Sequence, residues 1–281
     1  MEEEDVTFTF EQSLLQAAKA GDNNIVTILL ELGANIDYQN KGGGTALMFA
    51  SRTTITKLLS FYLKKMLILI FKTKKDHNGL TALMFASLDG HYQVVEFLLK
   101  QNADPNLQTQ KGSTALTFAS VNGHYQVIEL LLKEKADPNL QDQEGWTALI
   151  FASHIGDHQV VELLLKENAD PNLQAQNGWT ALMFASQNGH YRVVELLLKE
   201  NADPNLQDQE CWTASTVASQ NDHLEIAHLL EKYIDPSSSS CKELDHSINQ
   251  PIEITSSDIL IPDQQTEEPN KQLQNIRQQS L

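Results

Sequence analysis

Two histidines of the chain have a spacing that could bind a metal ion. His154 and His158 are four residues apart, the separation at which two side chains on one helix can reach the same zinc ion. Gly156 lies between them, at a position that predicts a turn between two helices. The two rings are therefore not expected to share a helical face, and we interpret both histidines as structural or solvated.

Carboxylates form the second set of residues that could do chemistry. They recur at one place in successive copies of a repeated string, as Asp104, Asp137, Asp170 and Asp203. A catalytic pair would be expected once, so this repetition favours a role in building a loop. The sequence also lacks a P-loop, a G-x-S-x-G string and a Cys/His cluster. We predict that the protein is not an enzyme and has no cofactor or metal site.

The repeated string positions all of these residues. Its clearest copy, residues 177–209, reads NGWTALMFASQNGHYRVVELLLKENADPNLQDQ. The Thr-Ala pair that begins TALMFAS recurs along the chain, first after an interval of 36 residues and then at intervals of 33 residues. It stands at Thr45, Thr81, Thr114, Thr147, Thr180 and Thr213.

Each copy predicts two helices joined by a tight turn. Thr180 can cap the first helix, and Gly189 suits a turn with positive φ. The second helix, from about Tyr191 to Glu200, has an apolar arc too broad for one surface, and Asn201 suits a left-handed stop. One such helix pair cannot bury its own apolar face, so stability must come from stacking.

A period near 33 with a T-x-L-x-x-A string resembles the ankyrin repeat family, and the resemblance covers roughly residues 13–233. It implies an all-α solenoid of stacked helix-turn-helix units with extended loop fingers. It also implies a non-enzymatic scaffold whose concave face, built from loop tips and first helices, binds another protein. The family has no common catalytic residues to carry over.

The chain departs from the family pattern G-x-T-P-L-H-x-A-A-x-x-G-H at two places. Alanine replaces the proline throughout (Ala46, Ala82, Ala115, Ala148, Ala181, Ala214), and the family histidine becomes Met48, Met84, Thr117, Ile150, Met183 and Thr216. In the family that proline preorganises the first helical turn, and that histidine ties adjacent loops by hydrogen bonds. The resemblance therefore implies that apolar packing replaces this polar tie.

The repeats predict the domain organisation. We expect a flexible acidic lead-in at 1–12, an array at 13–234 and a disordered Ser/Gln/Glu-rich tail at 235–281. The array divides into 13–39, a degenerate copy at 40–75, regular copies at 76–108, 109–141, 142–174 and 175–207, and a cap at 208–234. The first copy is expected to cap its end with polar residues. In the tail, Ile259 to Ile261 could add a strand to a partner's sheet, although an inert tail is the simpler interpretation.

The degenerate copy contains an apolar stretch from Leu58 to Phe71. A membrane span needs about 20 apolar residues, and this stretch is shorter and is interrupted by Lys64 and Lys65. We expect a lengthened, buried helix. A segment from an imperfect gene model and a membrane contact are the alternatives.

The composition limits the possible partners. The net charge of −17 argues against nucleic acid or an anionic membrane surface. The N-terminus, MEEEDVTF, is acidic where a secretory signal would be basic and then apolar. Cys211 and Cys241 form no disulfide framework, so we expect a reducing compartment, the cytoplasm or the nucleus.

Positions that vary while the frame repeats are the candidates for recognising a protein or peptide. One row follows the turn glycine: Leu80, Ser113, Trp146, Trp179 and Trp212. Tryptophan is the residue most enriched in binding hot spots, although each indole could instead pack as filler over its neighbour's loop. The inner-face candidates are Leu88, Asp89, Val121, Asn122, His154, Ile155, Gln187 and Asn188, with His77, Lys111, Glu144 and Asn177 on the loop tips.

The sequence thus predicts a protein-binding scaffold, with no nucleic acid and no small-molecule substrate. An alternative is a signalling or ubiquitin-pathway adaptor, in which the array binds cargo and the tail recruits other machinery. A membrane-associated array that uses Leu58 to Phe71 is a third, less favoured reading.

Overall fold

The structure, a computed structural model, describes residues 9–32, 34–35, 38–52 and 75–233. The chain divides into two compact units, Met1–Cys241 and Lys242–Leu281. The second unit lies outside the described residues, as do the predicted tail, residues 1–8 of the lead-in and the stretch from Leu58 to Phe71.

All regular elements of the described residues are helices, which confirms the all-α prediction. The first helices of the copies are α1 (Phe10–Ala20), α3 (Ala46–Arg52), α5 (Ala82–Leu88), α7 (Ala115–Val121), α9 (Ala148–Ile155), α11 (Ala181–Gln187) and α13 (Ala214–Gln220). The second helices are α2 (Asn23–Glu31), α6 (Tyr92–Lys100), α8 (Tyr125–Lys133), α10 (His158–Lys166), α12 (Tyr191–Lys199) and α14 (Leu224–Glu231).

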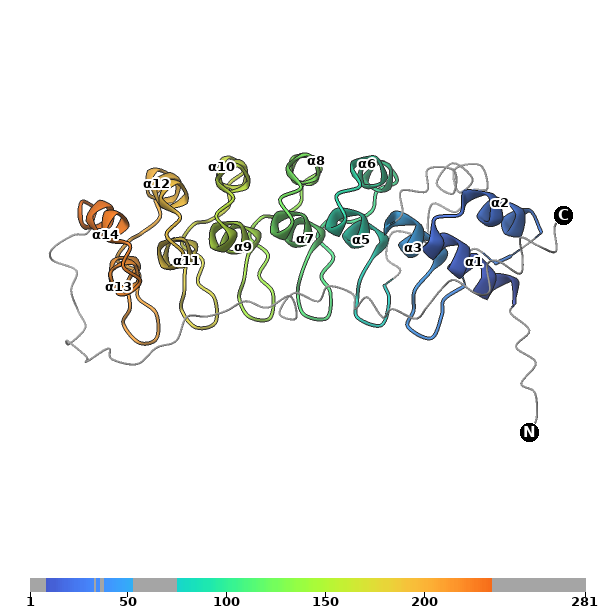
Figure 1. The fold of residues 1–281 in the computed structure, drawn as a ribbon, viewed down its shortest axis with the longest axis horizontal. Helices are drawn as coiled ribbons and strands as arrows, with labels where there is room; N and C mark the ends of the chain where they lie inside the picture. Colours follow the sequence, from blue (N-terminus) through green and yellow to red (C-terminus); the bar gives the residue numbers. More distant parts are fainter. Residues whose placement is uncertain (1–8, 33, 36–37, 53–74, 234–281) are drawn as a thin grey trace, which may run out of the picture. The chain divides into compact units, whose positions relative to one another are not determined.

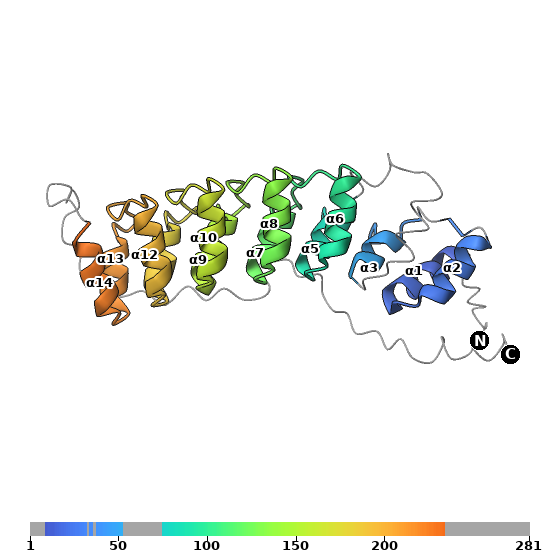
Figure 2. The ribbon, with the colours of Figure 1, turned by 90° about the horizontal axis from the view of Figure 1, so that it is seen from above.

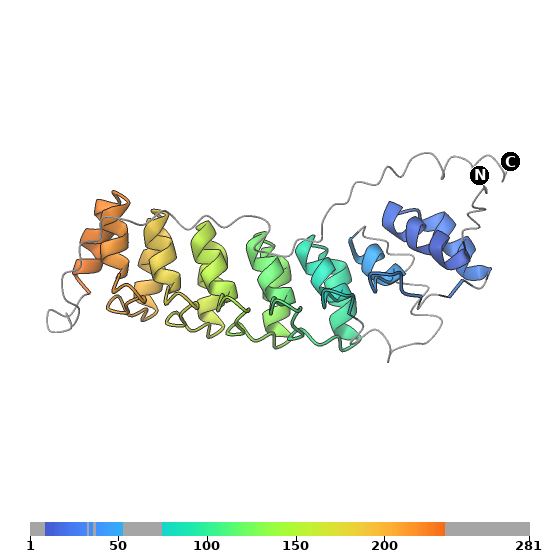
Figure 3. The same cartoon turned by 90° about the horizontal axis from the view of Figure 1, so that it is seen from below.

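From α5 to α14 the helix pairs stack side by side in two layers. Figure 1 shows the row of second helices above the row of first helices, with the loops that join successive copies projecting below. Seen from above in Figure 2 and from below in Figure 3, the helices of each layer run nearly parallel. We call these projecting loops the fingers, and we call the surface formed by the fingers and first helices the inner face.

Threonine caps explain where the first helices begin. The backbone at Thr147 is extended, and its hydroxyl accepts a hydrogen bond from Ile150 N at 3.2 Å. The same cap forms at Thr180, where Met183 N is the donor at 3.3 Å. This hydroxyl satisfies one of the backbone N–H groups that a helix start leaves without a partner. The predicted cap is confirmed.

The helix stops also match their local sequence. Asn201 adopts φ 63° after α12, and Gly189 adopts φ 73° between α11 and α12. These left-handed conformations suit asparagine and glycine. In the last copy Cys211 and Asp222 adopt φ 66° and 61° where the regular copies have glycine, so the turns keep their shape despite the substitutions.

The core lies between successive helix pairs. In α12 the buried side chains are Val193, Val194, Leu197 and Leu198. In α11 the whole helix from Ala181 to Gln187 is buried, since neighbouring first helices cover it on both sides. Stacking, rather than any one helix pair, thus removes the apolar surface from water.

The N-terminal copy differs from its prediction. Helix α1 begins at Phe10, inside the predicted lead-in, because Thr9 and Gln12 form a reciprocal capping box. This copy also leaves Phe10, Ile28 and Leu32 more than half exposed. Its surface is therefore more apolar than the polar cap that the sequence predicted.

The tie between adjacent fingers differs from the apolar packing that the resemblance implied. Met84, Ile150 and Met183 are buried as expected, but glutamine side chains supply a polar tie of their own. Gln143 Nε2 donates to Gln110 O at 2.9 Å, and Gln209 Nε2 donates to Gln176 O at 2.7 Å. A second row runs from Gln108 through Gln141 and Gln174 to the carbonyl of Gln207.

Two further findings concern the setting of the array. Cys211 is disulfide-bonded, in contrast to the free thiols expected in a reducing compartment, and Cys241 lies outside the described residues. No helix within the described ranges has the length and apolar character needed to cross a bilayer.

Candidate functional site

A carboxylate closes the finger at its base in several copies, including those of Asp142 and Asp208. Asp142 Oδ1 accepts hydrogen bonds from Glu144 N at 3.0 Å and Trp146 N at 2.7 Å. Burial raises the pKa of the Asp142 carboxyl, while these two bonds oppose the shift. Asp208 makes the same pair of bonds in the last finger. The residue after the turn is therefore held in a defined place.

The row that follows the turn divides into buried and partly exposed members. Leu80, Ser113 and Trp212 are buried, with exposed fractions of 1%, 5% and 7%. Trp146 and Trp179 are only half-buried. Within this row, only these two indoles offer appreciable surface to a partner.

The two half-buried tryptophans belong to one aromatic cluster that crosses repeats. The Trp146 ring lies 4.8 Å from Phe151 in its own repeat and 4.4 Å from Phe184 in the next. Trp179 lies 5.0 Å from Phe184, and its Nε1 donates to Asp208 Oδ2 at 2.8 Å. Both indoles therefore pack as inter-repeat filler, and both also contribute surface.

His154 joins the same cluster at its inner edge. Its ring lies 5.9 Å from Trp146 and 5.7 Å from Phe184. Burial lowers the pKa of His154, and the nearby His190 lowers it further. Asn188 Nδ2 lies 3.0 Å from both His154 Nδ1 and His154 O, so an amide donor faces the ring nitrogen. This geometry suits a neutral imidazole.

The remaining inner-face candidates show a range of exposure. Leu88 and Gln187 are buried, Asp89 and Val121 are half-buried, and Asn122 and Asn188 are exposed. Ile155 follows His154 at the end of α9, and 47% of its surface is exposed. One exposed aliphatic residue thus directly follows a member of the aromatic cluster in the sequence.

The His154/His158 pair does not share a helix. His154 lies in α9, His158 is the first residue of α10, and Gly156 between them adopts φ 88°. Gly156 thus lies in a turn between two helices, as the sequence predicted. Within the described part of the chain, no three His, Cys, Asp or Glu side chains group as metal ligands would.

The recurring carboxylates build loops, as predicted. The Oδ1 atoms of Asp104, Asp137, Asp170 and Asp203 each accept the backbone N–H two residues later at 2.9 Å. The asparagines that follow then reach the next copy. Asn139 Oδ1 accepts from Asp170 N at 2.7 Å, and Asn139 Nδ2 donates to Asn168 O at 3.2 Å.

Histidines form another connection between repeats, with one exception. The Nε2 atoms of His124, His190 and His223 each donate to a carbonyl in the first helix of the preceding copy, at 3.0 Å. Asp157 occupies the corresponding place directly before α10, and its carboxylate instead caps that helix by accepting hydrogen bonds from Gln159 N and Val160 N. The junction between α7 and α9 therefore lacks this bond.

Three charged residues on the fingers were missing from the sequence candidates. Lys41, Lys75 and Glu210 are all exposed. They lie on the fingers, as do the predicted His77, Lys111 and Glu144, which are also exposed. An alignment of the copies would have identified these three residues, because each lies at, or within three residues of, the position directly before the turn residue Gly43, Gly79 or Cys211.

The stacked helix pairs, capped first helices and tied fingers define a helical repeat scaffold. A family model described as "Ankyrin repeats (3 copies)" matches overlapping segments at residues 14–109, 58–142, 101–175 and 150–240. These segments cover most of the chain, and the protein therefore belongs to the ankyrin repeat family.

Similar proteins occur in unrelated organisms. The ankyrin repeat and KH domain-containing protein mask-1 of Caenorhabditis elegans is 32% identical over 36% of this chain and 4% of its own length. The putative ankyrin repeat protein L92 of Acanthamoeba polyphaga mimivirus is 36% identical over 28% of this chain and 19% of its own. The probable E3 ubiquitin-protein ligase XBOS33 of Oryza sativa subsp. japonica is 39% identical over 30% and 16%. The matched part thus spans less than one-fifth of each relative.

Proposed function

We propose that the array is a non-enzymatic scaffold that binds a protein or peptide on its inner face, around Ile155 and the cluster of Trp146, His154 and Trp179. The observation that carries this proposal is the exposure of Ile155, which directly follows His154 of the half-buried aromatic cluster in the sequence. An apolar anchor at the edge of rigid aromatic side chains is typical of a binding hot spot.

The rings are preorganised for such contact. Trp179 is held by Asp208 and His154 by Asn188, so a partner would not have to order these side chains. Binding loses less conformational entropy when the surface is already ordered. The net charge of −17 argues against nucleic acid as the partner, and we propose no small-molecule substrate.

Replacing Ile155 by glutamate tests the site. Ile155→Glu should weaken capture of a partner by at least about tenfold, since a buried, unpaired charge at a hot spot costs 1.4 kcal/mol or more. Leu224→Glu is the matched control, because Leu224 is a similarly exposed aliphatic residue outside the inner face. Partners are identified by affinity capture and mass spectrometry with the wild-type chain, and their affinities are then measured with purified proteins.

Equal affinities of the two variants would rule out this site. Circular dichroism at increasing temperature checks that both variants fold. Replacing Trp146 and Trp179 by alanine is a less direct test, because both rings contact the next repeat and their removal is expected to destabilise the stack.

A second candidate function is that of an adaptor in the ubiquitin pathway. The observation that favours it is the similarity to XBOS33 and to the E3 ubiquitin-protein ligase XBAT33 of Arabidopsis thaliana, which is 37% identical over 30% of this chain and 16% of its own. In this function the array would bind cargo, and residues 236–281 would recruit a second protein. Deleting 236–281 should then remove one interactor and leave cargo binding intact. An unchanged set of interactors would refute the adaptor.

A further inference from the structure

The fingers form a regular row because backbone hydrogen bonds join each finger to the next. A backbone N–H of one finger donates to a carbonyl of the preceding finger: His77 to Gly42 at 2.8 Å, Gln110 to Asn78 at 2.9 Å, Gln143 to Lys111 at 2.8 Å, Gln176 to Glu144 at 2.8 Å and Gln209 to Asn177 at 3.4 Å. The glutamine side chains described above reinforce the same contacts. Side chains at the tips are thus presented at a fixed spacing.

The charges along this row are sorted by sign. We define the loop-tip row as Lys41, Lys75, His77, Lys111, Glu144 and Glu210, all of which are exposed. The three fingers nearer the N-terminus carry the lysines and the histidine. The later fingers carry the glutamates, apart from one finger with the neutral tip Gln176-Asn177.

The partly buried carboxylates at the finger bases change this pattern little. Asp142 and Asp208 add negative charge to the fingers that already carry Glu144 and Glu210. Asp76 and the exposed Asp104 are exceptions in the basic half. The Oδ1 atom of Asp76 accepts hydrogen bonds from the backbone N–H groups of Asn78 and Leu80, and that of Asp104 accepts one from Asn106 N. The row therefore has a basic half and an acidic half.

We infer that the loop-tip row binds an extended polypeptide in one direction, with acidic residues over Lys41 to Lys111 and basic residues over Glu144 to Glu210. This inference rests on the proposed function and adds the charge pattern and direction of the partner. A nucleic acid fits poorly, because its phosphates would face the glutamates of the later fingers.

The dimensions suit an extended segment. Neighbouring helices pack about 8–10 Å apart, so the six fingers from Lys41 to Glu210 span roughly 50 Å. An extended chain advances about 3.3 Å per residue, and about 15 residues would therefore cover the row. The screening length is about 8 Å at physiological salt, so the charges at each end of the peptide interact mainly with the half of the loop-tip row that lies next to them. Single exposed ion pairs are weak, and the sorted row acts through several of them together.

Two synthetic peptides test the charge pattern. Both have about 15 residues and identical composition, but one has glutamates at one end and lysines at the other, and the second alternates the two. At low salt the sorted peptide should bind at least about fivefold more tightly by fluorescence anisotropy, and the difference should vanish near 1 M salt, where the screening length is about 3 Å. Equal affinities at low salt would overturn the inference.

A charge-reversed protein tests the direction. A nitroxide on the glutamate end of the sorted peptide should broaden amide NMR signals of residues 76–141 more than those of residues 175–233. The variant Lys41→Glu, Lys111→Glu, Glu144→Lys and Glu210→Lys keeps the net charge and changes only exposed residues, so circular dichroism should be unchanged. In this variant the broadening should move to residues 175–233, and unchanged broadening would overturn the inference.

The two proposals fail separately. If Ile155→Glu abolishes partner capture but the peptides show no preference, the inner face remains a binding site and the sorted row is refuted. If the peptides show the expected direction while Ile155→Glu has no effect, the row binds and the aromatic site is refuted.

Discussion

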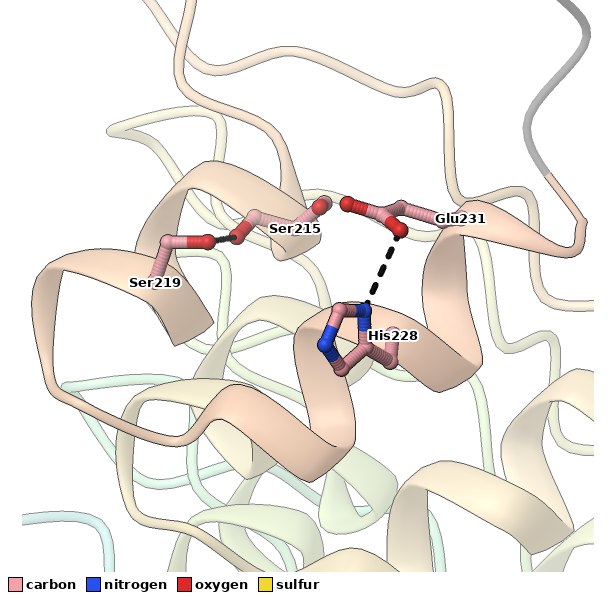
Figure 4. A network of polar contacts seen from close by, with 4 residues as sticks. All are labelled: Ser215, Ser219, His228 and Glu231. Atoms are coloured by element: carbon pink, nitrogen blue, oxygen red, sulfur yellow. Dashed lines mark hydrogen bonds and ion pairs between the residues drawn. The ribbon is translucent and has the colours of Figure 1, made fainter.

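At the scale of single residues, the repeated string buries a serine hydroxyl without a hydrogen-bond partner in four successive copies of the described array. Ser87, Ser120, Ser153 and Ser186 stand where the family pattern has its second alanine. Their hydroxyls are buried without a hydrogen-bond partner among the described residues. In the last copy Ser219 Oγ instead donates to Ser215 O at 3.0 Å (Figure 4) and is exposed. The serine hydroxyl at this position thus lacks a hydrogen-bond partner inside the described stack and has one in the last copy.

Ser153→Ala should therefore raise the free energy of unfolding by about 1 kcal/mol, because it removes a buried polar group that has no partner. Urea denaturation measures the change. Ser219→Ala is the matched control, and it should change the unfolding free energy by no more than about 0.5 kcal/mol. A lower stability of Ser153→Ala would show that its hydroxyl contributes a favourable interaction.

His154 should make stability depend on pH. Burial and His190 lower its pKa in the folded chain below the usual 6.5, so the unfolded chain takes up a proton first as the pH falls. The stability that His154 contributes is complete above about pH 6.5 and is lost as the pH drops towards the folded pKa. His154→Gln should have a smaller decrease in melting temperature between pH 7 and pH 5 than the wild type. An unchanged pH dependence of the melting temperature in His154→Gln would contradict this prediction.

At the scale of the helix, the cap at each first helix acts without the family proline. Ala148 is the first residue of α9, directly after the Thr147 cap, where a backbone N–H has no helical acceptor. Thr147 is extended, with φ −103° and ψ 167°, which is the conformation that a following proline favours. The backbone at position 148 is thus compatible with the proline that the family pattern has there.

Ala148→Pro should stabilise the protein by about 0.4–1 kcal/mol, since proline restricts the unfolded chain and is compatible with this position. Differential scanning calorimetry should show a higher melting temperature. Ala152→Pro, in the same helix but beyond its first turn, should lower the unfolding free energy by about 3 kcal/mol or more. A destabilising Ala148→Pro would mean that the start of α9 is less regular than the structure shows.

At the scale of the whole molecule, stability depends on the contacts between repeats. The last copy covers one side of α11: Trp179 Nε1 bonds Asp208, and His223 Nε2 donates to Gln187 O. Its own far side contains polar groups such as His228 and Glu231. These contacts agree with a role as the cap of the array, which stays a prediction.

Ending the chain after Gln207 should expose the far side of α11 and α12 and lower the unfolding free energy by at least about 2 kcal/mol, because the final interface is lost. Ending it after Tyr233 keeps that interface and should change stability little. Both truncations are compared by urea denaturation in the presence of a reducing agent, which removes any effect of the Cys211 disulfide. Equal stabilities would contradict the role of the last copy as a cap.

The local features of the fold were predictable from the repeated string. Thr180 caps its helix, Asn201 ends the following one, and Asp203 builds its loop as the sequence indicated. These features depend on residues within about four positions of each other, so a single copy contains all the information that they need.

The candidate site was only partly predictable, since burial depends on the neighbouring copy. Leu80, Ser113 and Trp212 occupy the same register as Trp146 and Trp179, yet the first three are buried and the other two are half-exposed. The sequence alone determined the period, the helices and the family. Only the tertiary structure decided that Ile155 is exposed, that glutamines tie the fingers, and that the charges of the fingers form one row. Each of these depends on contacts between residues about 33 positions apart, which the order of residues in one copy does not specify.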